Sequence, residues 1–371
     1  MEGGQQFRFM FWCKNCLNTS TRPRITFDKK GFCNACQWSE EKKKINWKSR
    51  QKLLKKFIKN KNKLYDCIVP VSGGKDGSYV AYMLKKKFNF NPLCITVRPP
   101  LEEEIGKKNL LNFIKSGYDH IHISPNQEAM QKLNKFGFIH KGFPYYGWLI
   151  AIHTSILRIA ASFGINLIFY GEDGEVEYGG SDSTKNEAFY NVIYQKKIYL
   201  EDGYDKIIKK LKLQESKKYF FKFPENKEIK DVLITHWSYF ENWDSYRNYL
   251  VAKKECGLDE QRESNEGTFT NFAQNDQALY SLHTYMMYLK FGFGRATQDA
   301  GIEIRRGSMT RSQAINLVNM YDNSYPEKFI KLYLHYFNIN RKTFDKILDK
   351  WVNKKLFSKV NGRWKPKFQI S

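Results

Sequence analysis

The sequence is short of acidic residues and has no long apolar run, and each shortage limits what the protein can be. Among its 371 residues, 38 are acidic and 62 are basic, which gives a formal net charge of +24. Such an excess favours an anionic ligand, either a nucleic acid or a small substrate that carries phosphate or carboxylate groups. Because lysine is spread along the whole chain, we attribute most of the charge to lysine-rich composition and do not expect a nucleic-acid partner.

No stretch is apolar enough to indicate a membrane span or a secretory signal. The longest uncharged stretch, Gly142–Leu157, is shorter than the roughly 20 residues of a spanning helix and contains His153. The N-terminal sequence MEGGQQFRFMFW has no long apolar core and no small-residue cleavage site. We therefore expect a cytoplasmic protein without a membrane partner.

Seven cysteines are present, and four of them are spaced as metal ligands rather than as a disulfide framework. Two CxxC pairs, in CKNC and CNAC, are separated by 16 residues. Two residues between thiolates let one tight turn present both sulfur atoms to a tetrahedral ion, and four thiolates leave no open coordination position. The pattern predicts a structural zinc ion, with an iron–sulfur cluster as the less favoured alternative. The expected ligands are Cys13, Cys16, Cys33 and Cys36.

A glycine-rich turn follows the short apolar run YDCIVPV at residues 65–71. Its sequence, SGGKDGS at residues 72–78, precedes apolar residues at helical spacing, so we expect a strand, a turn and a helix. Such a turn brings backbone N–H groups and the positive end of the helix dipole to one point, which makes an anion site. Neither GxxxxGK[ST] nor GxGxxG is present, so the turn is neither a Walker loop nor a dinucleotide fingerprint.

The segments that follow alternate between predicted strands and helices, as in a doubly wound, mostly parallel α/β sheet. Motifs at the carboxyl ends of parallel strands share one crevice, so Gly171–Asp173 should face the glycine turn. The last ten residues are interpreted as a tail. The expected organisation is a zinc ribbon at 1–45 with a short strand at 25–28, a connecting helix at 46–64, an ATP-binding α/β domain at 65–205 and a mostly helical region for substrate or partner at 206–371.

The glycine turn resembles the SGGxDS loop of the PP-loop ATP pyrophosphatases, a superfamily that includes GMP synthetase, asparagine synthetase and tRNA thiolases. Those enzymes transfer AMP from ATP to a carbonyl oxygen and release pyrophosphate. The residues that match their loop are Ser72, Gly73, Gly74, Lys75 and Asp76. The resemblance implies that the serine and glycines cradle pyrophosphate, that the lysine reaches a phosphate, and that the aspartate acts through Mg²⁺. Gly77 replaces the usual second serine, and we expect Ser78 to supply that hydroxyl.

A wider resemblance, over roughly residues 10–325, is to the N-acetyl sugar amidotransferase family. The cysteine ribbon, VSGGKD, TVRPP, IFYGEDGEVEYGG and FGFGRATQDAGIEIRRGSMTR carry it. Members act in the biosynthesis of nonulosonic acids, such as pseudaminic and legionaminic acid, and of acetamidino sugars of O-antigens. The resemblance implies that ATP activates an acetamido group as an adenylylated imidate, and that ammonia then displaces AMP to give an acetamidino group.

The resemblance also implies roles for residues outside the glycine turn. The end of the second strand lies beside adenine in the resembling fold, which places Thr96 and Arg98 at the nucleotide. Gly171, which ends a later strand and faces the glycine turn, is also expected to bind the nucleotide. In GEDGEVEYGG, Glu172 and Glu177 are the expected catalytic carboxylates, orienting ammonia or holding Mg²⁺. Arginine pairs well with carboxylates and phosphates, so a cluster near residue 300 is expected to bind a nonulosonate or a nucleotide sugar. The expected substrate-binding residues are Tyr178, Arg295, Arg305 and Arg306.

Ammonia is expected from outside the chain. An N-terminal-nucleophile glutaminase needs a cysteine directly after Met1, and Glu2 stands there. The resemblance implies a separate partner pair like the glutaminase and cyclase subunits of imidazole glycerol phosphate synthase. The main alternative is a tRNA thiolase, which generally needs reactive cysteines near the loop. The three cysteines left for that task are Cys67, Cys94 and Cys256, of which the first two lie in predicted strands. A non-catalytic ATP-binding or nucleic-acid module is the remaining alternative.

Overall fold

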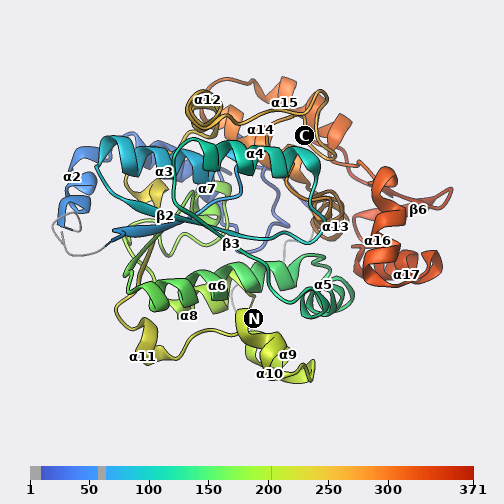
Figure 1. The fold of residues 1–371 in the computed structure, drawn as a ribbon. Coiled ribbons are helices and arrows are strands. Elements are labelled where there is room, and N and C mark those ends of the chain that lie inside the picture. The colour runs from blue at the N-terminus through green and yellow to red at the C-terminus, as the bar shows by residue number, and fades with distance from the viewer. Residues whose placement is uncertain (1–9, 57–63, 202) are drawn as a thin grey trace.

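The centre of the protein is a five-stranded parallel sheet (Figure 1). The computed structural model describes residues 10–56, 64–201 and 203–371. The strands are β1 (Cys67–Pro70), β2 (Pro92–Val97), β3 (His120–Ile123), β4 (Leu167–Tyr170) and β5 (Leu233–His236). Their order in space is β3-β2-β1-β4-β5, so the winding direction reverses between β1 and β4. The predicted parallel α/β sheet is confirmed, and ligands of such sheets bind beyond the carboxyl ends of the strands at that reversal.

Helices cover both faces of the sheet (Figure 1). Helices α3 (Lys75–Lys87) and α4 (Glu104–Lys115) lie on one face, and α6 (Tyr146–Phe163) lies on the other with α5 (Gln127–Lys141) beside it. Successive strand side chains point to opposite faces, so alternate strand residues enter the cores above and below the sheet. These two cores fix the strand ends that carry the glycine turn.

The N-terminal module is less regular than its sequence predicts. It contains α1 (Asn34–Lys42), α2 (Trp47–Lys52) and the 3₁₀ turn η1 (Leu54–Lys56). The expected strand at 25–28 does not form, and only Phe27 makes an isolated bridge, to Cys33. The connecting helix expected at 46–64 is a short helix and a turn as far as residue 56, and residues 57–63 lie outside the described part.

The fifth strand lies beyond residue 205, where the α/β domain was expected to end. Strand β5 pairs with β4 along its whole length, so the sheet extends into the next region. The four residues LITH carry too short a pattern to stand out between helical segments. The elements between the two strands are α7 (Gly174–Tyr178), α8 (Val192–Tyr194), the π-helical turn η2 (Gln195–Tyr199), α9 (Tyr204–Lys210), α10 (Glu215–Lys218), η3 (Tyr219–Phe221) and α11 (Asn226–Ile229).

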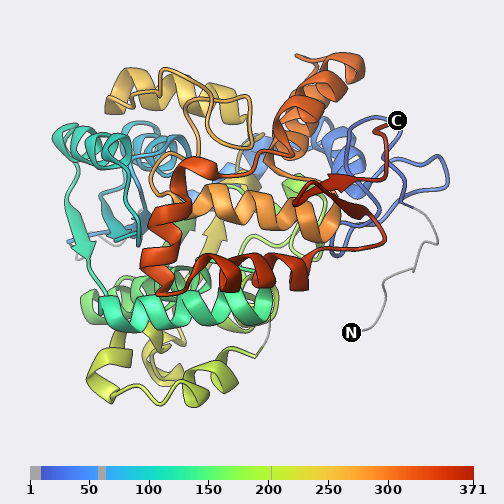
Figure 2. The same ribbon diagram turned by 90° about the vertical axis from the view of Figure 1, so that its right-hand side faces the viewer.

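The region after β5 is mostly helical, and Figure 2 shows its last helices beside α5. Phe138 of α5 packs against Phe337 and Phe344 in a shared core. Part of the expected C-terminal tail, residues 363–366, instead forms the second strand of a hairpin. In the described part of the chain, no helix combines the length and apolarity needed to cross a membrane. The elements are η4 (Trp237–Tyr239), α12 (Ser245–Cys256), α13 (Leu279–Phe291), α14 (Arg295–Arg305), α15 (Arg311–Tyr321), η5 (Glu327–Phe329), α16 (Ile330–Phe337), α17 (Arg341–Trp351), β6 (Phe357–Val360) and β7 (Arg363–Pro366).

Candidate functional site

The glycine turn lies at the reversal point of the sheet, between β1 and the start of α3. Gly73 has a positive φ of 79°, and a Cβ built there would lie 2.3 Å from the backbone nitrogen of Leu110. A Cβ at Gly77 would lie 2.6 Å from the carbonyl oxygen of Pro70. The close approach of α3 to β1 therefore explains why glycine replaces the second serine of the resembling loop. Helix α3 has no side-chain cap within the described residues, so its first N–H groups are available to an anion.

Two charged side chains stand at this helix start. Lys75 pairs with one carboxylate oxygen of Asp76, and the Lys75 side chain is only 8% exposed. The second oxygen, Asp76 Oδ1, is buried and has no hydrogen-bond partner among the described residues. Buried polar atoms without a partner are rare and call for a ligand or an ion. A carboxylate oxygen is a ligand that Mg²⁺ prefers, so the residues present fit the expected metal.

Ser78 lies deeper than the other residues of the turn. It is fully buried one turn into α3, and its hydroxyl lacks a hydrogen-bond partner in the described parts of the chain. It lines none of the cavities formed by the described residues around the turn. The expected hydroxyl contact from Ser78 to the nucleotide stays a prediction.

The segment after β4 faces the glycine turn, as the parallel topology predicts. A Cβ at Gly171 would lie 3.2 Å from Asp76 Cβ and 3.2 Å from the Trp243 ring. Burial raises the pKa of Glu172, and the negative charge of Asp76 raises it further while Lys75 opposes the shift. The Tyr178 hydroxyl donates a 2.9 Å hydrogen bond to Glu172 Oε1. Glu172 is thus a carboxyl group held close to the turn with a raised affinity for a proton.

Arg295 joins this group from α14. Its Nε donates a 2.8 Å hydrogen bond to Asp299 Oδ1. Burial lowers the pKa of Arg295, but the negative charges of Asp299, Glu172 and Asp76 outweigh burial and raise it. The charges of Glu172 and Asp76 therefore act on Arg295. Its position near the glycine turn depends on the three-dimensional fold, because the two segments are far apart in the sequence.

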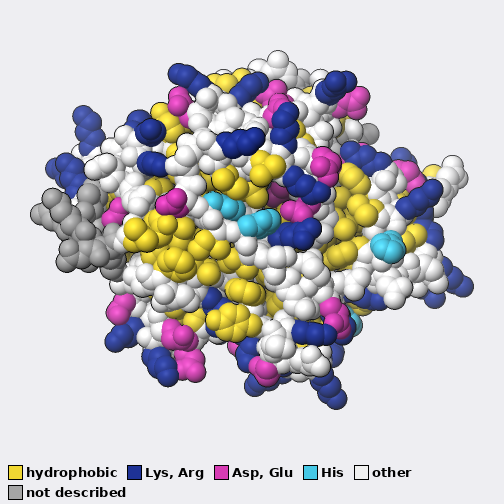
Figure 3. Space-filling model, viewed as in Figure 1, with side chains coloured by type: hydrophobic (Ala, Val, Ile, Leu, Met, Phe, Trp, Pro, Cys, Tyr) yellow, Lys and Arg dark blue, Asp and Glu magenta, His cyan; other side chains and the backbone are white. Residues whose placement is uncertain are grey.

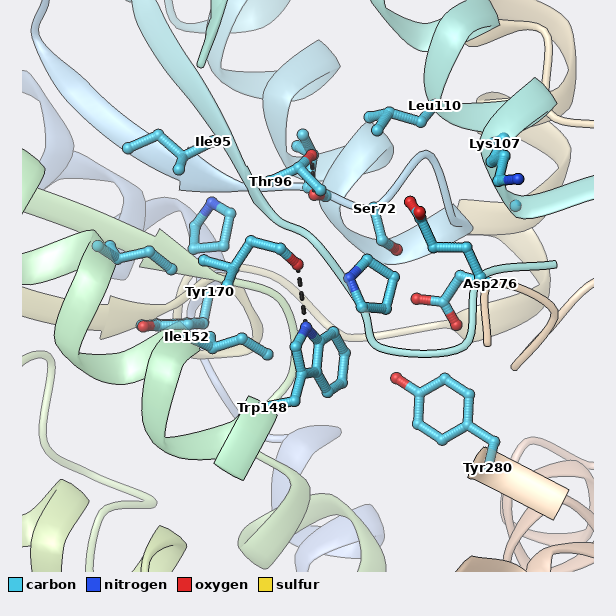
Figure 4. A pocket seen from close by; sticks show the side chains of 17 residues that line it. Ser72, Ile95, Thr96, Lys107, Leu110, Trp148, Ile152, Tyr170, Asp276 and Tyr280 are labelled. Carbon is cyan, nitrogen blue, oxygen red and sulfur yellow. Dashed lines mark hydrogen bonds between the residues drawn. The ribbon is translucent and has the colours of Figure 1, made fainter. Parts of the chain in front are cut away.

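A cavity of about 220 Å³ opens beside the turn (Figure 4). Its inner walls are largely apolar. Thr96 lines the cavity, and its hydroxyl donates a 2.7 Å hydrogen bond to the Val71 carbonyl oxygen. The indole N–H of Trp148 donates to the Val97 carbonyl oxygen at 3.0 Å, which fixes the ring in the wall. An apolar cavity next to an anion site suits a ligand that joins an apolar ring to phosphate groups.

Arg98 lies outside this cavity. Its Nε donates a 2.8 Å hydrogen bond to Glu102 Oε2, and nearly half of the side chain is exposed. It lines a separate surface hollow instead. The predicted pair at the end of β2 is therefore divided, with Thr96 at the cavity and Arg98 beyond it.

Helix α7 separates the turn from a second hollow of about 280 Å³. Tyr178, Trp243, Arg305 and Arg306 line it. Arg305 donates a 3.1 Å hydrogen bond to the Glu177 carbonyl oxygen, and Arg306 pairs with Asp244 and Glu303. Tyr178 lines this hollow and also donates a hydrogen bond to Glu172. The side chain of Tyr178 therefore lies between this second hollow and the glycine turn.

Both carboxylate oxygens of Glu177 have partners in the N-terminal module. Trp38 Nε1 donates to Oε1 at 2.9 Å, and Lys42 Nζ donates to Oε2 at 2.7 Å. The ion pair is largely buried, with side-chain exposures of 10% and 11%. Glu177 thus joins the two modules, and contact with ammonia or Mg²⁺ would require these bonds to open. Its catalytic role stays a prediction.

The four predicted metal ligands come together in the structure. All four sulfur atoms are buried and lie within 4.8 Å of one another, with Cys13–Cys36 at 3.7 Å and Cys16–Cys33 at 3.6 Å. A tetrahedral ion with Zn–S bonds of 2.3 Å spaces its sulfur atoms about 3.8 Å apart. The cluster therefore fits a zinc ion, as predicted.

The cysteine module holds α7 through side-chain amides. Asn18 Nδ2 contacts Cys33 Sγ at 3.4 Å and also donates to the Tyr178 carbonyl oxygen at 2.9 Å. Asn34 Nδ2 donates to the Gly180 carbonyl oxygen at 2.7 Å. The side chain of Asn18 therefore links Cys33, a predicted metal ligand, directly to the helix that carries Tyr178. In this way the cysteine module holds the end of α7 in place beside the crevice at the glycine turn.

Four side chains around the crevice carry no motif and were not singled out from the sequence. Trp148 and Trp243 shape the two hollows, and Asp276 and Tyr280 close the cavity beside the glycine turn from the C-terminal region. Tyr280 lies on an apolar-aromatic helix that predicts core packing. Nothing in the sequence around Asp276 signals a ligand, because its position depends on contacts with residues 101–106.

The C-terminal part of the chain matches a known domain. Residues 266–369 match the family described as LPS biosynthesis protein WbpG-like, C-terminal domain. A second similarity is to an uncharacterized protein of Methanocaldococcus jannaschii, at 33% identity over 107 residues, or 28% of this chain. The match spans only 38% of that relative's length. The C-terminal part of the chain is thus similar to a domain of proteins of lipopolysaccharide biosynthesis.

Proposed function

We propose that the protein is an ATP-dependent amidotransferase that converts the acetamido group of a sugar into an acetamidino group during the biosynthesis of a surface polysaccharide. One observation carries the proposal. The reversal point of the sheet joins a glycine turn, an unpartnered Asp76 oxygen and the Glu172 carboxyl group beside an apolar cavity. The WbpG-like domain supports the choice of a lipopolysaccharide sugar as the substrate.

The first step would use the glycine turn. The acetamido oxygen attacks the α-phosphorus of ATP, the bond to the β-phosphate breaks, and pyrophosphate leaves. The N–H groups at the start of α3 and the Lys75 ammonium would stabilise the charge on the leaving group. Asp76, with one free carboxylate oxygen, would hold the Mg²⁺ ion that neutralises the phosphates. The product is an imidate whose oxygen carries AMP.

The second step would use the carboxyl group of Glu172. Ammonia attacks the imidate carbon, the carbon–oxygen bond breaks, and AMP leaves with the former amide oxygen. The attacking nitrogen must lose a proton, and a carboxylate with a raised pKa is a suitable acceptor near neutral pH. The hydrogen bond from Tyr178 would orient that carboxylate. The sum is amide, ammonia and ATP giving amidine, AMP and pyrophosphate, with the amide oxygen in AMP and the protons of ammonia shared between the amidine and pyrophosphate.

The sugar would occupy the hollow behind α7. Two of its cations, Arg305 and Arg306, suit a carboxylate or a diphosphate, and the Trp243 ring offers a flat face for the apolar side of a sugar. Arg295, on the nucleotide side, would stabilise charge at the phosphates. Ammonia would come from a separate glutaminase and cyclase pair, which the resemblance implies.

The chemistry of the remaining cysteines favours this function over sulfur transfer. Cys67, Cys94 and Cys256 are buried, and burial raises the pKa of each thiol, that of Cys256 to about 11. A thiol with a raised pKa is a poor nucleophile at neutral pH. On the face seen in Figure 3, basic side chains are scattered among acidic and apolar ones rather than gathered in one patch for a nucleic acid.

Pyrophosphate release tests the proposal. The full chain would be assayed with ATP, Mg²⁺ and ammonium against N-acetylated nonulosonates, nucleotide-linked N-acetyl sugars and bulk tRNA. We expect release that depends on one of the sugars, and a product lighter by about one mass unit as oxygen is replaced by NH. Turnover only with tRNA and a sulfur donor would assign the protein to the alternative class, and formation of ADP would contradict AMP transfer altogether.

A further inference from the structure

The cavity beside the glycine turn is completed by the C-terminal region. Ser72 and Trp148 line it from the sheet side, whereas Asp276 and Tyr280 line it from the start of α13 and the segment before it. Figure 4 shows the side chains of Ser72, Asp276 and Tyr280 around the same space, with the Tyr280 hydroxyl directed toward Asp276. A polar wall from the WbpG-like domain therefore stands opposite the nucleotide turn.

Backbone contacts hold Asp276 at this wall. Its carbonyl oxygen accepts a 3.0 Å hydrogen bond from the Glu103 N–H, and the Ala278 N–H donates to the Leu101 carbonyl oxygen at 2.8 Å. A Cβ at Gly106 would lie 2.5 Å from Asp276 Cα, so α4 and this segment are in direct backbone contact. A side chain on so constrained a backbone is presented at a defined place, as ligand recognition requires.

The groups along the cavity follow the order of the parts of a nucleotide. The apolar end, with Ile95, Ile152 and Tyr170, suits a purine ring, and Ser72 marks the turn that suits the phosphates. Ribose connects the base to the phosphates, and its hydroxyl groups need hydrogen-bond acceptors. A carboxylate is an acceptor with two oxygen atoms, and acidic side chains bind ribose hydroxyls in other doubly wound folds.

Two carboxylates, Glu102 and Asp276, line the cavity, and only Glu102 forms an ion pair within the described residues. Glu102 is paired with Arg98, whereas the described residues include no ion pair of Asp276 within 4.0 Å. Burial raises the pKa of Asp276 to about 7, as expected for a carboxyl group that lacks such a partner. Asp276 is thus the carboxylate left for a ligand.

We propose that Asp276 binds the ribose hydroxyls of the nucleotide, with Tyr280 beside it, so that the C-terminal region selects ribonucleotides. This inference rests on the proposed function, because it takes the cavity to be the ATP site. It gives the WbpG-like domain a direct part in nucleotide recognition. It also explains why residues 275–278 are joined to the start of α4 through the backbone.

Equilibrium binding of ATP, 2′-deoxy-ATP and 3′-deoxy-ATP to the full chain, by calorimetry with Mg²⁺, tests the inference. At pH 8, above the raised pKa of Asp276, the wild-type protein should bind ATP about tenfold more tightly than at least one deoxy analogue, because a hydrogen bond to a charged acceptor is lost. Asp276→Asn should bring the ratio close to one. The matched control Asp259→Asn, at an exposed carboxylate paired with Lys108 outside the cavity, should keep the wild-type ratio.

The outcomes separate this inference from the function on which it rests. Equal affinity of the wild-type protein for all three nucleotides overturns the ribose contact and leaves the ATP site intact. An equal, Mg²⁺-dependent loss for all three in Asp276→Asn also overturns it, because a metal ligand behaves in that way. No binding of ATP by the wild-type protein overturns both. If Asp276→Asn does not fold, the affinity ratios of the wild-type protein and of Tyr280→Phe test the ribose contact instead. A wild-type ratio near one would still overturn it.

Discussion

The cysteine cluster and the crevice at the glycine turn differ in how completely the protein satisfies their polar groups. At the cluster, the sulfur atoms accept hydrogen bonds from the side chains of Asn15 and Asn18 and from the Cys33 N–H. At the crevice, Asp76 Oδ1 is buried without a partner in the described residues, and burial raises the pKa of Glu172. A structural metal needs a closed set of partners, whereas a reacting ligand needs an open one. The first site should therefore govern stability, and the second should govern activity.

The largest effect should come from opening the closed site. Cys33→Ser removes one ligand of a tetrahedral ion, and structural zinc contributes on the order of 10 kcal/mol to the folding of small modules. We expect loss of bound zinc, measured as metal content, together with loss of a cooperative thermal transition for the module. Cys256→Ser, at a buried cysteine away from the cluster, is the control and should retain the metal. Full metal content in Cys33→Ser would contradict the assignment.

The next effect should separate activity from stability. Asp76→Asn removes the expected Mg²⁺ ligand, and the loss of such a catalytic group lowers turnover by about 10²–10³-fold. The melting temperature should change by only a few degrees, because one carboxylate oxygen has no partner among the described residues. Asp205→Asn on α9 is a matched exposed control. Unchanged pyrophosphate release in Asp76→Asn would exclude the turn from the chemistry.

The contact between the two sites should give an intermediate effect. Lys42→Met leaves Glu177 without its largely buried partner, and breaking such a pair costs about 3 kcal/mol of unfolding free energy. Lys43→Met is the matched control, because its partner Glu40 is exposed. If Glu177 acts only by holding α7, Lys42→Met and Glu177→Gln should lower turnover by similar factors. A far larger loss in Glu177→Gln would show that its carboxylate takes part in the reaction.

The smallest effect concerns pH. Because burial raises the pKa of Asp276 from 3.8 to about 7, its neutral form favours the folded state. Its contribution to stability is therefore complete below pH 4 and is lost as the pH rises through 7. A shift of this size corresponds to about 4 kcal/mol at full burial. Because Asp276 is only partly buried, we expect about half of this, so the wild-type unfolding free energy should fall by roughly 2 kcal/mol more than that of Asp276→Asn over this interval. The measurement is the free energy of unfolding in urea as a function of pH. If it changes with pH in the same way in both proteins, the raised pKa of Asp276 is contradicted.

The sequence alone predicts those features that depend only on residues close together in the chain. The four cysteine ligands and the strand–turn–helix around Ser72–Gly74 each lie within one short segment, so spacing identifies them. The facing of Gly171 and Asp76 follows from parallel topology, because strand ends meet at one edge of the sheet. These local patterns account for the sheet, the metal cluster and the position of the crevice.

The remaining features depend on contacts between distant segments. Asp276 reaches the cavity because residues 275–278 pair with residues 101–103, and no local pattern records that pairing. Glu177 stands in an acidic run that suggests chemistry, yet both of its oxygens bind the cysteine module. Arg98 follows the expected strand but turns to Glu102 rather than to the cavity. Such outcomes are set by packing, which a single sequence does not display.

The most direct test of the account follows one oxygen atom. A substrate sugar labelled with ¹⁸O in its acetamido carbonyl would be turned over with ATP, Mg²⁺ and ammonium, and the products would be analysed by mass spectrometry. If the amide oxygen attacks the α-phosphorus, the label leaves with the nucleotide and AMP becomes heavier by about two mass units. Label in inorganic phosphate, with ADP as the nucleotide product, would contradict adenylylation at the glycine turn.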